Sequence, residues 1–218
     1  MVNQRTRVKV CCISSVEEAT LAIQYGADAI GLVGPMPSGP GIIDNVLIHE
    51  ITSSLPAAVS TFLLTSETDA ESIIAHHKLV NTTTIQLVDA VDPTTHAAIK
   101  KALPTIKLVQ VIHVMNENSI EEAEKISHSV DAILLDSGNP NLEIKELGGT
   151  GRVHNWEISR RIVEAVTTPV FLAGGLNPNN VAQAIKAVKP FGVDLCSGVR
   201  TDKKLDEKKL AAFFGHVK

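Results

Sequence analysis

Two apolar runs in the C-terminal part of the sequence end in glycine, a pattern that favours binding of a phosphate group. Val170–Ala173 runs into Gly174–Gly175, and Val193–Cys196 runs into Ser197–Gly198. Glycines just past parallel strands let backbone N–H groups approach an anion closely. The pair Asn177–Pro178 predicts a helix cap and first helical residue beside the first glycines, which adds a favourable dipole. Two ordinary strand-to-helix turns are the alternative explanation.

Three ionisable side chains stand at the predicted ends of other apolar runs. Asp89 follows Thr84–Val88, His113 lies near the end of Ile106–Val114, and Asp136 closes the run Ile-Leu-Leu-Asp. Catalytic groups occupy such positions in α/β barrels, and so do helix-capping groups. Each of the three is therefore a candidate for proton transfer, with capping or another structural role as the alternative.

The elements that must position these groups alternate between short β-branched runs and longer amphipathic segments. The predicted strands begin near Val8, Ala29, Val59, Thr84, Ile106, Ala132, Val170 and Val193. Eight such strand–helix units in 218 residues predict a single α/β domain over residues 1–218, a (β/α)₈ TIM barrel. An open, doubly wound parallel sheet is the second possibility. The first strand is expected over Val8–Ile13 and the last helix over Leu205–Phe214, docked by Leu210, Phe213 and Phe214.

The composition excludes several classes of function. Hydrophobic residues make up 44% and charged residues 20%, which is typical of a soluble globular protein, and the net charge of −4 gives no reason to expect nucleic acid. The sequence has no long apolar run and no export signal, so we expect a cytoplasmic protein without a membrane partner. The cysteines and histidines show neither disulfide nor metal-ligand spacing, so no metal is expected.

Two connections are longer or richer in glycine than a simple turn needs. Residues 34–41 read Gly-Pro-Met-Pro-Ser-Gly-Pro-Gly, and the segment from Ser137 to Asn155 contains Gly148-Gly-Thr-Gly151. Long ordered loops in compact domains usually bind or cover a ligand. We expect the second segment to close over the substrate.

Six short motifs, in this order and at this spacing, resemble the phosphoribosylanthranilate isomerase family over nearly the whole chain. The first, Lys9-Val10-Cys11-Cys12-Ile13, corresponds to the family's Lys-Ile-Cys-Gly-Ile. The others are Gly26 to Gly31, Leu134-Leu135-Asp136-Ser137, Gly149-Thr150-Gly151, Ala173 to Pro178 and Gly192 to Val199. The resemblance implies a (β/α)₈ barrel and an enzyme of tryptophan biosynthesis.

The implied reaction is an Amadori rearrangement, in which an N-linked ribose phosphate becomes an open-chain aminoketose without any cofactor. By family position Asp136 is the general acid that opens the sugar ring, and Cys11 is the base that removes the proton at sugar C2. Asp136 then needs a raised pKa, and Cys11 needs a lowered one. A small buried hydrophobe is the commoner role of a free cysteine. The phosphate would lie on Gly174, Gly175, Ser197 and Gly198, where barrels of this kind bind phosphate.

The sequence departs from the family where the anthranilate group would bind. The family's arginine in the loop after the second strand has no counterpart in Ser38-Gly39-Pro40-Gly41, and its Gln-Leu-His-Gly is Gln86-Leu87-Val88-Asp89. Arg200 stands where the family has glutamate, and either Arg200 or Arg152 is a candidate replacement for the missing charge. A lost Arg–carboxylate contact is worth a few kcal/mol. The candidate substrate contacts are Lys9, Gln86, Asp89, His113 and Arg200.

Three functions therefore remain open at this stage. The first is isomerisation of phosphoribosylanthranilate or a close N-glycoside. The second is a related isomerase, epimerase or lyase for another phosphorylated sugar, and the third is a phosphate-binding barrel without catalysis. Each takes a small phosphorylated sugar as its partner, and the protein would act as a monomer or a homodimer.

Overall fold

Eight parallel strands form a closed barrel in the computed structural model, which describes residues 5–37, 39–139, 141–142 and 151–217. In chain order they are β1 (Arg7–Val10), β2 (Ala29–Val33), β3 (Ser60–Thr65), β4 (Thr84–Leu87), β5 (Lys107–His113), β6 (Ala132–Asp136), β7 (Val170–Leu172) and β8 (Gly192–Leu195). Each strand pairs with its neighbour in sequence, and β8 pairs with β1 to close the barrel. The predicted TIM barrel is therefore confirmed, and the open sheet is wrong.

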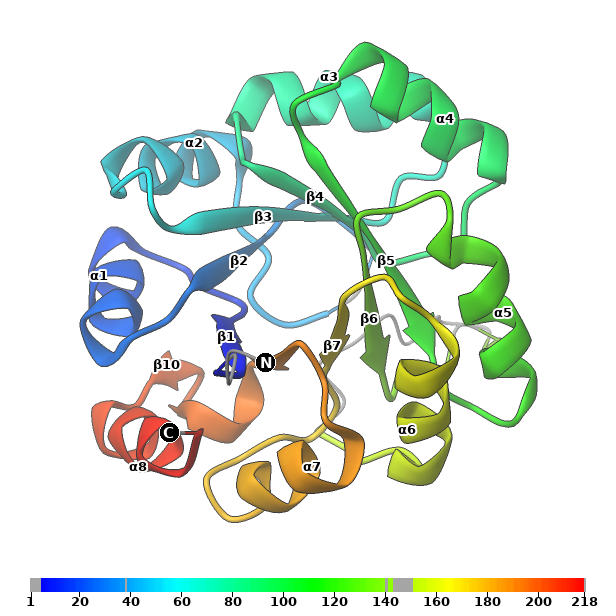
Figure 1. Ribbon diagram of the computed structural model, residues 1–218. Helices are drawn as coiled ribbons and strands as arrows, with labels where there is room; N and C mark the ends of the chain where they lie inside the picture. The colour runs from blue at the N-terminus through cyan, green and yellow to red at the C-terminus, as the bar shows by residue number, and fades with distance from the viewer. Residues whose placement is uncertain (1–4, 38, 140, 143–150, 218) are drawn as a thin grey trace.

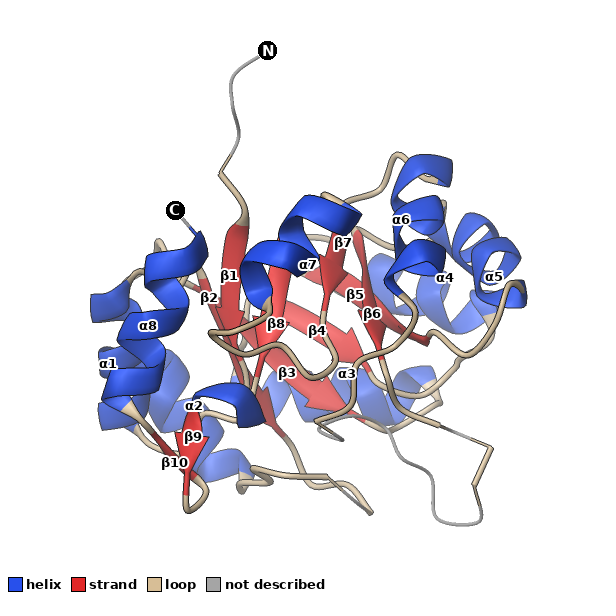
Figure 2. Ribbon diagram, turned by 90° about the horizontal axis from the view of Figure 1, so that it is seen from below, coloured by secondary structure: helices blue, strands red, loops and turns tan. Residues whose placement is uncertain are grey.

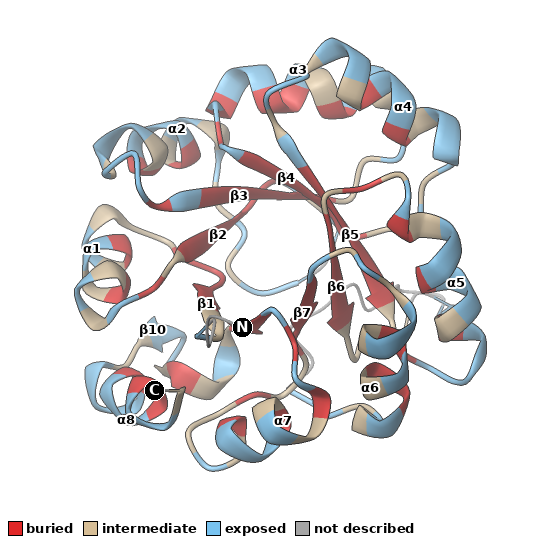
Figure 3. Cartoon of the chain, in the orientation of Figure 1, coloured by how far each residue is buried: buried red, intermediate tan, exposed pale blue. Residues whose placement is uncertain are grey.

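Helices surround the barrel as an outer ring (Figure 1). They are α1 (Val16–Tyr25), α2 (Asn45–Ser54), α3 (Ala70–Val80), α4 (Pro93–Ala102), α5 (Asn118–Ser127), α6 (Trp156–Ala165), α7 (Val181–Val188) and α8 (Glu207–Val217). Only their inner faces are buried, whereas the strands are buried almost throughout (Figure 3). No helix of the described residues is both long and apolar enough to span a membrane.

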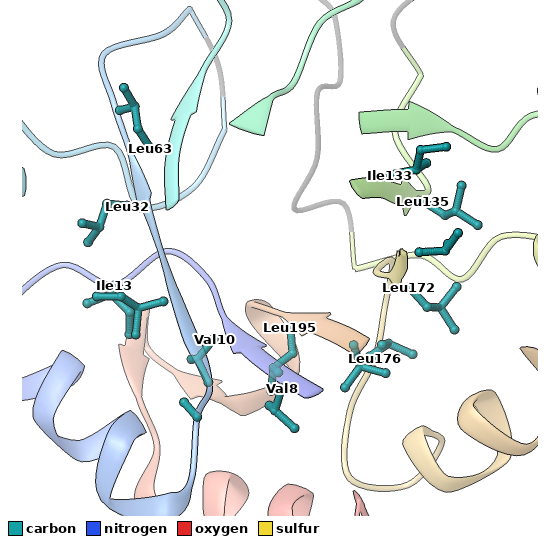
Figure 4. Close-up of a cluster of buried hydrophobic side chains, with 14 of the residues drawn as sticks. Val8, Val10, Ile13, Leu32, Leu63, Ile133, Leu135, Leu172, Leu176 and Leu195 are labelled. Carbon is teal, nitrogen blue, oxygen red and sulfur yellow. The ribbon is translucent and has the colours of Figure 1, made fainter. Parts of the chain in front are cut away.

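Two layers of buried side chains hold these elements together. Outward-facing strand residues such as Leu32, Leu63 and Leu135 pack against the helices (Figure 4). Inward-facing residues, among them Phe62, Val111 and Phe171, fill the barrel itself. Side chains alternate along each strand between the helix side and the barrel interior. Polar side chains at the inward-facing positions therefore lie in the barrel interior beside these apolar ones.

The strand starts agree with the sequence expectation to within one residue, but three segments differ. β1 ends at Val10 instead of Ile13, because Cys12 adopts φ +61°, outside the β region. α7 begins at Val181, one turn after the predicted Asn177 cap, although the Asn177 side chain does accept from the N–H of Asn179 at 2.9 Å. The last helix begins at Glu207, and its predicted contacts Leu210, Phe213 and Phe214 are buried.

The residues before α8 form elements that the sequence did not predict. A short 3₁₀ helix, η1 (Ser197–Val199), follows β8 and leads into an antiparallel hairpin of β9 (Arg200–Thr201) and β10 (Lys204–Leu205). Figure 2 shows this hairpin at the end of the barrel where the strands finish. Much of the predicted covering loop between Ser137 and Asn155 lies outside the described residues.

Candidate active site

A cavity opens at the carboxyl ends of the strands, where α/β barrels place their active sites. It holds about 710 Å³ of empty space including its mouth, enough for a sugar phosphate with an aromatic substituent. Six of the predicted site residues line it: Cys11, Gln86, Asp136, Gly174, Gly175 and Ser197. The fold therefore brings the predicted acid, the predicted base and the predicted phosphate loops to one cavity.

Cys11 lies just past β1, directly above a buried ion pair. The ammonium of Lys9 donates to Asp194 Oδ2 at 2.8 Å, and Lys9 is fully buried. A Cβ on Gly31 would lie 2.6 Å from Cys11 Sγ and 3.0 Å from Lys9 Nζ. The absence of a side chain at Gly31 therefore leaves the space in which the Cys11 sulfur and the Lys9 ammonium lie near each other.

The surroundings of Cys11 favour its thiolate. The pKa of Cys11 lies below its ordinary value because the Cys12 thiol hydrogen-bonds the sulfur; burial opposes this effect, and the charge of Lys9 adds to it. Burial alone would lower the pKa of Lys9, but Asp194 and then Cys11 raise it above its ordinary value. Lys9 thus stays positively charged and helps to lower the pKa of Cys11, as a cysteine base requires.

Cys12 occupies a position at which the family that the sequence resembles has glycine. The backbone conformation of Cys12 explains the family's preference for glycine there. Its φ of +61° is in the left-handed region that glycine adopts without cost. Its side chain packs on the loop after β2, where a Cβ on Gly41 would lie only 2.6 Å from Cys12 Cβ. Hydrogen bonds to Cys11 and Cys196, with burial, raise the pKa of Cys12 well above its ordinary value, so this residue remains a thiol.

Asp136 faces the same cavity from the end of β6. Burial raises the pKa of its carboxyl group, against the opposing effects of the Ser137 N–H, His113 and Lys9. Its Oδ1 accepts from the N–H of Ser137 at 2.7 Å. A carboxyl group with a raised pKa can stay protonated near neutral pH and donate a proton.

The two glycine turns form one continuous backbone surface. Gly174 and Gly175 adopt φ of +83° and +64°, and a Cβ on Gly198 would lie 2.0 Å from the Leu176 carbonyl oxygen. The carbonyl of Gly175 accepts from the side-chain amides of Asn177 at 3.1 Å and Asn180 at 2.9 Å. These bonds fix the loop after β7, and the close approach of Gly198 to Leu176 places η1 beside that loop, at the place predicted for the phosphate.

The end of the cavity opposite this surface is mostly apolar. Val33, Met36, Pro40, Leu64 and Val88 line it. Gln86 is the polar group among them: it is 3% exposed, and its Oε1 has no hydrogen-bond partner in the described part of the chain. Among the described residues that line the cavity there is no lysine or arginine.

The other predicted substrate contacts lie outside the cavity lining. Lys9 is beneath it, and His113 Nε2 pairs with the carbonyl of Val88 at 3.2 Å. Asp89 Oδ1 accepts from the N–H of Ala90 at 2.9 Å, which is a local turn bond. The guanidinium of Arg200 is bound to Glu18 and to backbone carbonyls. The backbone of Arg152 packs beside Gly175, at the phosphate end and away from Gln86.

Three ionisable residues of the cavity lining were not predicted as site residues. Asp194, Cys12 and Cys196 all line the cavity, and Asp194 Oδ1 is buried without a partner among the described residues. Asp194 lies two residues before Cys196, so both face the barrel interior. Once Val193–Cys196 was assigned as a strand, this alternation could have identified Asp194 and Cys196 as inward-facing residues. Across the described chain, no three His, Cys, Asp or Glu side chains are arranged to hold a metal ion.

Comparisons with known proteins agree with this geometry. Residues 8–216 match the family model of N-(5'-phosphoribosyl)anthranilate isomerase. N-(5'-phosphoribosyl)anthranilate isomerase 2 of Methanosarcina mazei is 38% identical over 214 residues, covering 97% of this chain and 94% of that protein.

Two crystal structures are similar over nearly their whole length. The phosphoribosylanthranilate isomerase of Thermotoga maritima superposes with a TM-score of 0.82 at 29% identity and covers 97% of this chain and 98% of its own. An isomerase bound to reduced 1-(o-carboxyphenylamino)-1-deoxyribulose 5-phosphate gives the same TM-score at 27% identity, with 97% and 98% covered. The chain therefore belongs to the N-(5'-phosphoribosyl)anthranilate isomerase family.

Proposed function

We propose that this chain isomerises phosphoribosylanthranilate, with Asp136 as general acid and Cys11 as general base, and that residues 1–218 act as one domain in the cytoplasm. The observation that carries this proposal is that Cys11 and Asp136, 125 positions apart in the sequence by subtraction of their numbers, line one cavity. Their pKa values are shifted in the two directions that the reaction needs. No cofactor enters the proposed reaction.

The proposed chemistry conserves atoms and protons. Asp136 protonates the ring oxygen of the sugar, the bond from C1 to that oxygen breaks, and the amine lone pair forms a Schiff base. The Cys11 thiolate then removes the proton from C2 to give an enolamine. In the tautomerisation to the aminoketose, C1 gains a proton and the C2 hydroxyl loses one. Proton exchange with solvent returns Asp136 to its acid form and Cys11 to its thiolate. Each proton transfer of this kind typically contributes about 10² to 10⁴ in rate.

The remaining parts of the cavity have matching roles in this proposal. The substrate phosphate would lie on the backbone of Gly174, Gly175, Ser197 and Gly198, where the absence of side chains at the glycines leaves backbone N–H groups accessible. Asp194 Oδ1, which has no partner within the described part of the chain, is suited to accept a hydrogen bond from a sugar hydroxyl. The aromatic ring would then lie between Val33, Met36 and Val88, with its carboxylate near the Gln86 amide.

The test is turnover of phosphoribosylanthranilate by the purified protein, followed by chromatographic separation of substrate and product. A folded protein that binds ribose 5-phosphate but does not convert phosphoribosylanthranilate would contradict the proposal. Melting-temperature shifts with a panel of phosphorylated sugars would then identify the ligand, because a ligand at 100 times its Kd stabilises by about 2.7 kcal/mol.

A second candidate follows from the absence of a cation among the described cavity residues. Under it the enzyme performs the same chemistry on a phosphoribosyl amine that carries no carboxylate. Comparing kcat/KM for phosphoribosylanthranilate and phosphoribosylaniline separates the two candidates. A large preference for the anthranilate substrate that Gln86→Leu abolishes supports the first, and a ratio near one supports the second.

A further inference from the structure

His76 of α3 is a buried side chain that contacts both ends of the loop after β2. Its Nε2 donates to Asn45 Oδ1 at 2.9 Å, since an amide oxygen can only accept. The neighbouring ring atom, Cε1, packs on Gly34: a Cβ added to that glycine would lie 2.6 Å from Cε1 and 2.9 Å from Nε2. One imidazole ring therefore contacts the residue that opens this loop and the residue that begins α2 just beyond it.

Glu67, in the loop after β3, faces the other nitrogen of the His76 ring. Its Oε2 lies 3.5 Å from His76 Nδ1, and the same oxygen accepts from the Thr65 hydroxyl at 3.3 Å. Thr65 ends β3 and is fully buried. Nδ1 itself has no hydrogen-bond partner among the described residues, so the bond to Asn45 and the packing on Gly34 set the orientation of the ring.

The two ends of the loop are also joined through their backbones. Val33 pairs with Ile42 in an isolated parallel bridge, and the N–H of Ile43 donates to the Val33 carbonyl at 2.9 Å. The N–H of Gly34 donates to a carbonyl of β3 at 3.0 Å. These bonds tie the loop to the strands. His76 ties it to the outer ring of helices, in which α2 and α3 are neighbours (Figure 1).

Residues between these two ends line the apolar end of the cavity. Met36, Gly39 and Pro40 belong to the lining there, together with Val88 from the end of β4. A shift at the base of the loop would move Met36 and Pro40 relative to Val88, whereas the glycine turns after β7 and β8 would stay in place. The position of the loop therefore controls the apolar end of the cavity separately from the phosphate end.

We propose that His76 is a positioning residue that determines specificity for the aromatic part of the substrate: by holding both ends of the loop after β2, it keeps Met36 and Pro40 against the ring. His76 does not line the cavity, so it acts through the loop and not by touching the substrate. The inference deepens the proposed function and rests on it, because that function places an aromatic ring at this end. It concerns the binding of the ring and not the proton transfers of Cys11 and Asp136.

The test compares two ligands that share the phosphate but differ in the aromatic ring. Calorimetric titration measures Kd for ribose 5-phosphate and for reduced 1-(o-carboxyphenylamino)-1-deoxyribulose 5-phosphate. In His76→Ala we expect Kd for the aromatic ligand to rise about tenfold and Kd for ribose 5-phosphate to stay within about twofold. KM for phosphoribosylanthranilate should rise in parallel with kcat little changed, because the loss affects the bound substrate and the transition state alike.

Two further substitutions of His76 and one of its neighbour make the test specific. His76→Gln can place its amide nitrogen where Nε2 lies and should restore most of the affinity, whereas His76→Asn is too short to reach Asn45 and should behave like His76→Ala. His77→Ala is the matched control. His77 is similarly buried on α3, but its Nε2 donates to the Thr82 carbonyl at 2.7 Å, beyond the end of the helix. The ratio of the two Kd values should be unchanged in His77→Ala.

Hydrogen exchange gives a readout that depends on no ligand. The amides of Gly34 and Ile43 should exchange faster in His76→Ala than in His77→Ala, because they lie at the two ends that His76 holds. If His76→Ala does not fold, Asn45→Ala replaces it, since this change removes the same hydrogen bond from a half-buried position at the start of α2. The same changes in Kd and in exchange are then expected at smaller size.

A ratio of the two Kd values that stays constant in folded His76→Ala, or that changes as much in His77→Ala, overturns the proposal, because His76 would then contribute only to general packing. Unchanged exchange at Gly34 and Ile43 overturns it as well. A wild-type protein that binds ribose 5-phosphate but not the aromatic ligand contradicts the proposed function instead, and the exchange measurement still decides whether His76 holds the loop. The two proposals can therefore fail separately.

Discussion

The ammonium of Lys9 and the carboxylate of Asp194 form a buried ion pair that joins the first strand of the barrel to the last, with 2.8 Å between Nζ and Oδ2. The ammonium also lies 5.2 Å from the centroid of the Phe62 ring, which gives the charge a second favourable contact. Lys9 favours the Cys11 thiolate and Asp194 opposes it to a smaller extent, so the ion pair that closes the barrel also contributes to the ionisation of the proposed base.

Removing one partner of this ion pair should lower the free energy of unfolding more than removing both partners. We expect Lys9→Met to lower the free energy of unfolding by about 3 to 5 kcal/mol, because it leaves the Asp194 charge buried without its partner. Lys9→Met combined with Asp194→Leu should be more stable than Lys9→Met alone. Urea denaturation at pH 7 gives the free energy of unfolding of the wild type, of Lys9→Met and of the double variant. Lys107→Met removes an exposed ion pair to Asp131 and should cost at most about 1 kcal/mol; an equal loss in Lys9→Met would contradict the role of burial.

Loss of either proposed catalytic group should reduce turnover without preventing ligand binding. We expect Cys11→Ser and Asp136→Asn each to lower kcat by about 10² to 10⁴, since each removes one proton-transfer group. The double variant should be little worse than the poorer single variant, because the two groups act in one reaction. Steady-state kinetics and the affinity for ribose 5-phosphate give the two readouts. Cys196→Ser, at the same cavity, is the control, and an equal loss of kcat there would argue against a specific role for Cys11.

The contact between Gly198 and the Leu176 carbonyl predicts intolerance of any side chain. In Gly198→Ala the new methyl group would lie 2.0 Å from a backbone oxygen, so the loop must move. We expect loss of phosphate affinity together with lower stability, measured by calorimetric titration with ribose 5-phosphate and by thermal unfolding. A Cβ on Gly215 in α8 would meet no atom of the described residues within 4 Å, so Gly215→Ala should bind phosphate normally and gain about 0.5 to 1 kcal/mol. Equal effects of the two substitutions would show that the close contact is unimportant.

His154 should make the protein less stable as the pH falls. Burial lowers the pKa of His154 to about 4, from 6.5 in the unfolded chain. Between these values the unfolded chain binds a proton that the folded protein does not, so stability is complete above pH 6.5 and declines toward pH 4. The difference corresponds to about 3 kcal/mol. His154→Phe should remove this component, so that its stability relative to wild type rises steadily between pH 6.5 and 4.

The control for that comparison is Val46→Ala, which changes no ionisable group and lies on the exposed side of α2. Its stability relative to wild type should be constant over the same pH range, measured by urea denaturation at several pH values. A flat difference for His154→Phe as well would mean that His154 ionises freely in the folded protein.

The sequence was most informative where local pattern decides structure. The eight strand starts and the position of Asp136 at a strand end follow from alternation and from the rule that parallel strands finish at one end, whereas Cys11 was assigned from the family resemblance. The Lys9–Asp194 pair could not be predicted in the same way, because its partners are 185 positions apart and meet only when β8 closes on β1. For the same reason Arg200 was taken as a substrate contact, since its partner Glu18 lies in α1.

The β9–β10 hairpin was missed for a different physical reason. Its two turn residues, Asp202 and Lys203, have φ of +49° and +65°, a conformation for which Asn-Gly is the usual signal. Neither residue is a glycine, so the turn has no local signature. Cys12 is a similar case, because a cysteine gives no sign of left-handed backbone.

The closure of the barrel by its last strand sets the order in which the site is completed during synthesis. A chain emerging from the ribosome presents Cys11 first and Asp136 next, but Lys9 meets Asp194 only after β8 has been made, and Cys12 meets Arg200 only after β9. A nascent chain that stops short of Gly192 therefore holds an unpaired lysine where the barrel should be closed. The ammonium that favours the Cys11 thiolate is therefore paired with its buried carboxylate only when the strand that completes the barrel has been made.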